Sequence, residues 1–166
     1  MSITPPETEY GFSYEYGLDV MLDGEEWQTV RFLSDFDPQV TSITQPGQTY
    51  DDKGAPHDIK TSESWVLTGN IQQHHLPTGE LLPEMQELKA LTEPTARGNA
   101  ANGTFRWYDN PATRAANPDE AYQGRGTVQL TRAATGADGA IGGWNFTVTG
   151  QGPRTKIAHP VDGAGA

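Results

Sequence analysis

The sequence predicts a mainly β domain with one flanking helix and one long connection between strands. Its 166 residues are enough for a single domain around one core. With 19 glycines, 12 prolines and an apolar fraction of 34%, the composition favours short strands and turns over helices. Several runs alternate apolar and polar residues, and only one run has helical spacing. We therefore expect residues 1–166 to form one domain.

The first predicted strands form a hairpin. Leu18 and Val20 alternate with residues that face the other way, residues 23–26 are typical of a turn, and residues 27–33 resume an extended pattern. Acidic residues are concentrated on this hairpin, and the alternation directs Asp19 to the face opposite Leu18.

A long connection separates this hairpin from the next strand, which period-two alternation places near residues 64–71. The connection, residues 34–62, contains three prolines and almost no periodic apolar residues. Compact domains seldom contain an unstructured connection of this length unless it has a role or is disordered. We interpret residues 34–62 as a long loop that acts as an interaction arm, with a disordered insertion as the alternative.

One segment, residues 81–91, has the pattern of a helix. Pro83 suits the first turn, and Met85, Leu88 and Leu91 recur at helical spacing. We expect Leu88 and Leu91 to pack on the sheet. Further strands are predicted in residues 104–108, 122–132, 144–149 and 154–157, and residues 161–166 are predicted to be a flexible tail.

Charge and composition exclude several classes of protein. The net charge is -11, and the first 83 residues hold most of the acidic residues but only three basic ones. Such a chain would repel phosphates, which argues against a free-standing nucleic-acid binder. The sequence contains no cysteine, which excludes a disulfide scaffold, a thiolate zinc site and a cysteine nucleophile. No apolar run is long enough to predict a membrane span.

Motifs for catalysis or metal binding are incomplete. The histidines lack motif spacing, the acidic turns lack the alternating oxygen ligands of a calcium loop, and neighbouring carboxylates need not converge on a substrate. We therefore expect no catalytic residue, metal or cofactor. The fragments concerned are His57 and His74-His75, Asp35-Phe36-Asp37, Asp51 to Gly54, Glu25-Glu26, Asp119-Glu120 and Gly124 to Gly126.

Five segments, taken in order, resemble the major tail protein, or tail tube protein, of long-tailed phages with non-contractile tails (siphoviruses), especially those that infect actinobacteria. They are RFLSDFDPQ (31–39), TYDDKGAPHDIKTSESW (49–65), FRWYD (105–109), EAYQGRGTVQ (120–129) and NFTVTGQGPRTKIAHP (145–160). The resemblance covers nearly the whole chain.

The resemblance implies a β-sandwich or barrel-like domain with one flanking α-helix, and a structural virion protein instead of an enzyme. It implies hexameric rings that stack into a tube, through which genomic DNA is ejected into the host without specific binding. The implied partners are other copies of the chain, a tape measure protein, and tail terminator and tip proteins, with no membrane. The implied location is the virion tail, after synthesis in the host cytoplasm.

Two groups of residues are candidates for the sites of such a tube. In the family a long loop reaches the next ring, and residues 34–62 match it in place and length, with Tyr50, Asp51 and Asp52 as candidate inter-ring contacts. An acidic lumen would let DNA slide without adhesion. The candidates for lining it are Asp19, Asp23, Glu25 and Glu26.

The alternative function is a non-catalytic β-sandwich binding module or virion decoration module. It would use exposed tryptophans, chosen from Trp27, Trp65, Trp107 and Trp144, to stack on sugars.

Overall fold

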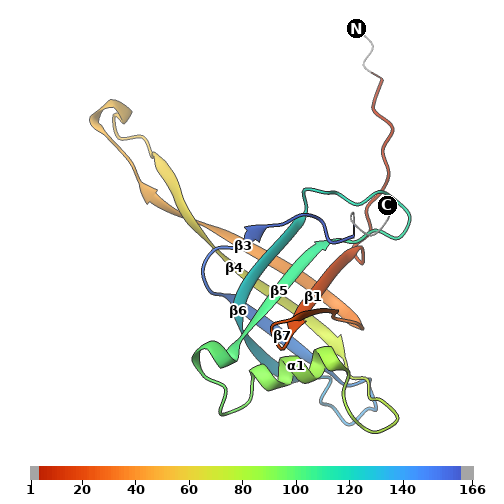
Figure 1. The fold of residues 1–166 in the computed structure, drawn as a ribbon. Coiled ribbons are helices and arrows are strands. Elements are labelled where there is room, and N and C mark those ends of the chain that lie inside the picture. The colour runs from red at the N-terminus through yellow and green to blue at the C-terminus, as the bar shows by residue number, and fades with distance from the viewer. Residues whose placement is uncertain (1–3, 162–166) are drawn as a thin grey trace.

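Within residues 4–161, eight strands form one curled antiparallel sheet, with one α-helix packed against it (Figure 1). The computed structural model describes residues 4–161. The strand order is β2-β1-β5-β6-β7-β4-β3, and β8 pairs with β6. The elements are β1 (Tyr16–Leu22), β2 (Glu26–Thr29), β3 (Leu33–Pro46), β4 (Asp58–Gln72), α1 (Pro83–Leu91), β5 (Asn102–Asp109), β6 (Ala121–Ala133), β7 (Gly143–Gly150) and β8 (Thr155–Lys156), with 3-10 turns η1 (Tyr50–Asp52) and η2 (Gly98–Ala101).

The predicted first hairpin is confirmed, but its second strand is shorter than predicted. β1 pairs with β2 across a turn in which Asp23 and Gly24 both have positive φ, as tight hairpin turns require. β2 ends at Thr29 instead of continuing to Leu33. Phe32 has a φ of 60°, which an extended strand does not permit, so the chain bends there before it enters β3.

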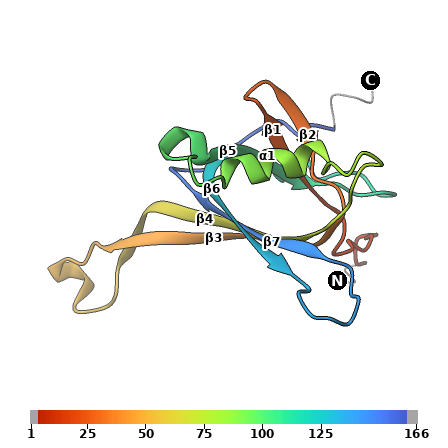
Figure 2. The same ribbon diagram turned by 90° about the horizontal axis from the view of Figure 1, so that it is seen from below.

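Residues 34–62 are not a loop, and this part of the prediction is wrong. β3 and β4 pair with each other from Leu33 and Ile71 to Pro46 and Asp58, so only residues 47–57 lie outside the strands. Pro38 is tolerated because β3 is an edge strand, where a missing backbone N–H breaks no ladder on the outer side. The distal part of this hairpin, residues 39–64, projects beyond the body of the domain, as both ribbon views show (Figures 1 and 2). We call it the arm.

The core lies on the inner side of the curled sheet. α1 packs on β1, β2, β5 and β6, and it buries Met85, Leu88 and Leu91, which confirms the predicted helix and its orientation. Leu91 is held so close to β5 that a Cβ on Gly103 would lie 2.8 Å from its Cδ1. The largest fully buried apolar side chains are Trp65, Trp107, Phe105, Phe146, Leu18, Leu67, Ile71, Leu88, Val20 and Val148.

Each of four buried carboxylates is paired with an arginine. Asp19 binds Arg106, Glu84 binds Arg31, and Glu15 and Asp109 both contact Arg114. Pairing is necessary because an isolated buried charge is costly. The free acidic charge of the chain is therefore carried by other, exposed residues.

Candidate assembly interface

The outer face of the β6–β7–β4–β3 side of the sheet is polar, and three rows of residues across it contain no basic side chain. Arg125, the next outward residue of β6, lies beyond these rows, and its Nη2 donates to the Asn99 carbonyl at 3.3 Å. The residues that alternate with core residues on these strands lie in three rows across the sheet, one residue from each strand. We call this surface the polar face. Its rows, from β3 to β6, are Asp35, Asn70, Asn145, Thr131; Asp37, Thr68, Thr147, Gln129; and Gln39, Val66, Thr149, Thr127.

Hydrogen bonds connect the polar face laterally. Asn70 Nδ2 donates to Asn145 Oδ1 over 2.9 Å, and Gln39 Nε2 donates to Asp37 Oδ2 over 2.7 Å. Val66 is the single apolar member, and the two aspartates bear the only charges. Such a surface suits contact with water better than burial in a protein interface, whose core is normally apolar and aromatic. It also offers a phosphate no cation.

The same part of the sheet has unpaired edges within the described residues. β3 pairs only with β4, so its outer edge is free along its whole length. β6 is free on one side from Val128 to Ala133, because its pairing with β5 stops at Thr127. A long free edge invites pairing with another chain. Beside the β6 edge lies an open groove of about 330 Å³ lined by residues that include Leu91, Ala101 and Leu130.

The arm adds exposed apolar side chains to its free edge. Val40, Ile43 and Ile59 are 39%, 41% and 50% exposed. A two-stranded ribbon with both faces in water is only marginally stable by itself. The arm is therefore suited to being covered by another molecule.

At the arm tip, the three predicted contact residues divide into two kinds. Tyr50 is fully exposed, and Asp51 is exposed beside it. Asp52 instead organises the tip, because its carboxylate accepts hydrogen bonds from the Thr49 backbone N–H at 2.7 Å and lies 3.2 Å from His57 Nδ1. The hydrogen bond from the Thr49 N–H, and to a smaller extent the contact with His57, lowers the pKa of Asp52. The role of these residues in inter-ring contact stays a prediction.

Of the four residues predicted to line a lumen, Asp19 does not present a free carboxylate. It is 2% exposed, and it accepts hydrogen bonds from Arg106 Nε at 2.7 Å and the Tyr108 hydroxyl at 3.2 Å. Asp19 lies opposite Leu18, as predicted, but Arg106 and Tyr108 from β5 cover that face. Its expected exposure is therefore wrong.

Asp23, Glu25 and Glu26 are exposed at the β1–β2 turn. Asp23 lies beside α1. The pKa of Glu87 on this helix is raised, chiefly because Glu87 is partly buried and to a smaller extent because of the Asp23 charge. Whether this turn faces a lumen stays a prediction. Asp35 and Asp37 were not identified from the sequence as members of the polar face.

The tryptophans give the sugar-binding alternative little support. Trp65 and Trp107 are buried, and their ring centroids lie 5.1 Å apart in the core. Arg106 lies over the ring of Trp27 at 4.6 Å, and Lys89 over the ring of Trp144 at 4.4 Å. Trp27 and Trp144 are half-buried, and each has a cation over one ring face, so none of the four tryptophans is a freely exposed ring of the kind that stacks on sugars.

Other predicted sites have ordinary structural surroundings. His74 stacks on Phe32, and His75 lies 3.0 Å from the carbonyl oxygen of Gly79. Residues 4–161 contain no group of three or more histidine or acidic side chains placed to hold a metal ion. Among the same residues, no helix has the length and apolar character needed to cross a membrane. Most of the predicted tail, residues 162–166, lies outside the described residues.

Comparisons with known proteins identify the fold through solved structures. No family model and no curated protein matches the chain. A chain from the tail of an empty gene transfer agent particle, solved with C6 symmetry, superposes with a TM-score of 0.62 at 9% sequence identity, over 90% of this chain and 100% of that one. A chain from the virion of a native gene transfer agent particle gives a TM-score of 0.59, with the same identity and coverage.

The chain shares the fold of these particle proteins. At 9% identity the likeness establishes the fold alone. It confirms the predicted fold class, a mainly β, barrel-like domain with one flanking helix.

Proposed function

We propose that this chain is a structural subunit of a phage tail tube of the long, non-contractile type. Six copies form a ring, rings stack into a tube, and DNA passes through the lumen during ejection. Support comes from the fold shared with a chain of a C6-symmetric tail. The proposed role is structural and involves no catalysis, and its other partners are the tape measure, tail terminator and tip proteins implied by the sequence resemblance.

The polar face is the observation that carries this proposal, and we assign it to the lumen wall. Duplex DNA carries one negative charge for about every 1.7 Å of its axis, and basic side chains bind it by releasing counterions. The three rows of the polar face have aspartates at one side, neutral amides, hydroxyls and Val66 elsewhere, and no lysine or arginine. Arg125 adjoins the Thr127 end of the third row, where its guanidinium is bound to the Asn99 carbonyl. DNA would keep its counterions and slide past such a wall. This assignment replaces the β1–β2 turn as the main source of the lining.

The free edges support closure of a ring. The outer edge of β3 in one copy and the Val128–Ala133 edge of β6 in the next are both unpaired, and they flank the polar face on opposite sides. Head-to-tail pairing of these two edges repeats one heterologous contact, which closes into a ring at a suitable rotation. The polar faces of neighbouring copies would then continue into one another. The arm tip, with Tyr50 and Asp51, would reach an adjacent ring.

A lysine placement experiment tests the lumen assignment. One variant carries Asp37→Lys, Thr147→Lys and Gln129→Lys on the polar face. The matched control carries Asp23→Lys, Glu25→Lys and Glu26→Lys on the β1–β2 turn. Both proteins are assembled in the presence of short duplex DNA, and the tubes are isolated and treated with nuclease.

We expect the polar-face variant to retain nuclease-resistant DNA, more at low salt because phosphate binding weakens as salt rises. The control should hold at most nuclease-sensitive DNA. Nuclease-resistant DNA in the control alone would show that the turn lines the lumen. Purified wild-type protein that stays monomeric in electron micrographs at every concentration would refute the tube itself.

A further inference from the structure

The N-terminal segment, residues 4–14, exposes three aromatic side chains. Tyr10, Phe12 and Tyr14 are 89%, 55% and 74% exposed, and the rings of Phe12 and Tyr14 stack with centroids 5.6 Å apart. The segment extends away from the body of the domain (Figure 1). It contains Glu7 and Glu9 and no basic residue. Residues 12–15 form a turn, in which the Glu15 N–H donates to the Phe12 carbonyl at 3.0 Å. Aromatic side chains gathered on a segment exposed to water are characteristic of a segment that binds a partner.

A buried network holds the root of this segment in one direction. Glu15 is 4% exposed, its Oε1 accepts the Phe12 N–H at 2.8 Å, and its carbonyl accepts the Asn110 N–H at 3.2 Å. Arg114 joins Glu15 at 3.3 Å and Asp109 at 2.6 Å. These bonds between the segment and the body of the domain fix where the segment leaves it.

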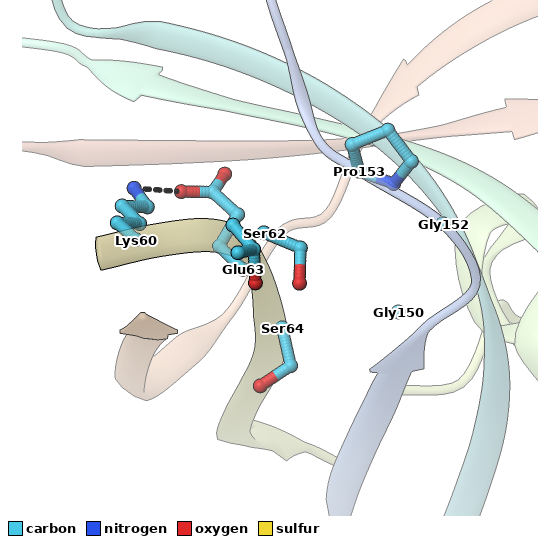
Figure 3. Close-up of a pocket in the computed structure, with 8 residues that line it drawn as sticks. Lys60, Ser62, Glu63, Ser64, Gly150, Gly152 and Pro153 are labelled. Atoms are coloured by element: carbon cyan, nitrogen blue, oxygen red, sulfur yellow. Dashed lines mark hydrogen bonds and ion pairs between the residues drawn. The ribbon is translucent and has the colours of Figure 1, made fainter. Parts of the chain in front are cut away.

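A groove at the root of the arm offers a matching surface. It has a volume of about 580 Å³, with Lys60 to Ser64 of β4 on one side and Gly150, Gly152 and Pro153 on the other (Figure 3). We call it the arm-root groove. β4 separates from β7 here, because their pairing begins only at Val66 and Thr149. Residues 58–65 of β4 therefore have a free backbone edge facing the groove.

The far wall of the groove is smooth and held in place. Trp65 Nε1 donates to the Gly152 carbonyl at 3.0 Å. A Cβ on Gly150 would clash with the Trp65 ring, so only glycine fits above that ring. Glycine and proline leave the wall with little side-chain relief, which suits the flat rings of an incoming aromatic segment.

The charges of the groove and the segment are complementary. Glu63 is the single acidic residue of the groove, and it is bound by both Lys60 at 3.1 Å and Arg154 at 2.8 Å. Lys60 is the single basic residue of the lining, and Arg154 lies beside the lining; together these two cations leave a positive excess over Glu63 in a chain whose net charge is -11. Glu7 and Glu9 of the segment would meet that excess.

We propose that the N-terminal segment of one copy enters the arm-root groove of a second copy, with residues 4–11 as an extended strand and Phe12 and Tyr14 in the turn at its base. Its backbone pairs with the free edge of β4, its aromatic rings cover the Gly150–Pro153 wall, and its carboxylates face Lys60. Pro5 and Pro6 favour an extended backbone but donate no N–H, so the backbone pairing falls to the residues that follow them. The inference rests on the proposed self-assembly and adds a third contact between copies, distinct from the β3–β6 edges and from the arm tip.

Cysteine cross-linking tests this contact directly, because the chain has no cysteine of its own. Protein carrying Glu9→Cys is mixed with protein carrying Ser62→Cys, and the mixture is oxidised mildly and separated without reductant. The control mixture pairs Glu9→Cys with Asp138→Cys, an exposed position on the loop between β6 and β7. We expect a disulfide-linked heterodimer of the Glu9 and Ser62 proteins and at least about tenfold less of it in the control.

A charge exchange gives the second measurement. Lys60→Glu should raise the protein concentration at which assembly begins, and Glu7→Lys with Glu9→Lys in the same chain should restore it. Replacing Tyr10, Phe12 and Tyr14 by serine should raise that concentration at least about tenfold, equivalent to about 1.4 kcal/mol. These variants keep the fold because the replaced side chains are exposed.

The outcomes separate this inference from the proposed function. Wild-type tubes without the mixed cross-link would refute the docking of the segment and leave the tube intact. A cross-link that forms only when both cysteines are in one chain would show that the segment folds back on its own groove. No tubes and no mixed cross-link would refute both proposals.

Discussion

Replacing Leu88 by alanine should destabilise the isolated domain by about 3 to 5 kcal/mol. Leu88 is 1% exposed and lies in the middle of the apolar side of α1. The substitution removes three carbon atoms, each worth about 0.8 kcal/mol of burial, and leaves a cavity that adds to the loss. α1 cannot move to fill that cavity, because Arg31 holds Glu84 at one end at 2.8 Å and Leu91 packs closely on Gly103 at the other.

Urea unfolding of the dilute, unassembled protein, followed by tryptophan fluorescence, measures this change. Gln86→Ala on the exposed side of the same helix is the control and should stay within about 0.5 kcal/mol of wild type. A loss below about 1 kcal/mol for Leu88→Ala would contradict the placement of α1 in the core. If the variant were stable as a monomer but defective in assembly, α1 would instead be an intersubunit helix.

Two further predictions concern acid unfolding and the arm. Hydrogen bonding from Arg114 chiefly lowers the pKa of Asp109 in the folded state, so the stability that Asp109 contributes is present above its unfolded pKa and is lost as the pH falls through the lower folded value. Arg114→Met should therefore lower the stability of the domain at pH 7 and make that stability fall less steeply below about pH 4. Thermal unfolding measured across this pH range gives the dependence of stability on pH. A dependence with the same slope as in the wild type would refute this reasoning. Deleting residues 45–56, which removes the arm tip with Tyr50 and Asp51, should leave a folded monomer that forms no tubes in electron micrographs, and normal tubes would show that the tip is dispensable.

The sequence predicted the elements whose two faces differ in burial. One side of each of these elements is apolar: β1, β5, β6, β7 and α1. The local sequence therefore shows their pattern, as alternation around Val128 in β6 and as helical spacing around Leu88 in α1. The arm was missed as a pair of strands because both of its faces are exposed. Thr41 and Ile43 have the β-branched side chains that favour strands. However, an alternation of apolar and polar residues appears only in a strand that is buried on one side, and neither side of the arm is buried.

The candidate sites were harder to predict because they depend on neighbours that are distant in sequence. Asp19 is buried by Arg106 and Tyr108, which reach it only because β5 pairs with β1. The polar face similarly joins Asp37 of β3 to Gln129 of β6 through two intervening strands. Local alternation identified the polar residues of each strand as solvent-facing. It could not reveal the strand order that assembles them into one surface without basic side chains.

A cryo-electron microscopy reconstruction of tubes assembled from the purified protein would test the central claim most directly. The account predicts sixfold rings whose lumen wall is the polar face, with Asp37, Thr147 and Gln129 facing the channel. It also predicts that the β3 edge of each copy pairs with residues 128–133 of the next. A reconstruction with the polar face on the outside of the tube, or buried between copies, would contradict the account.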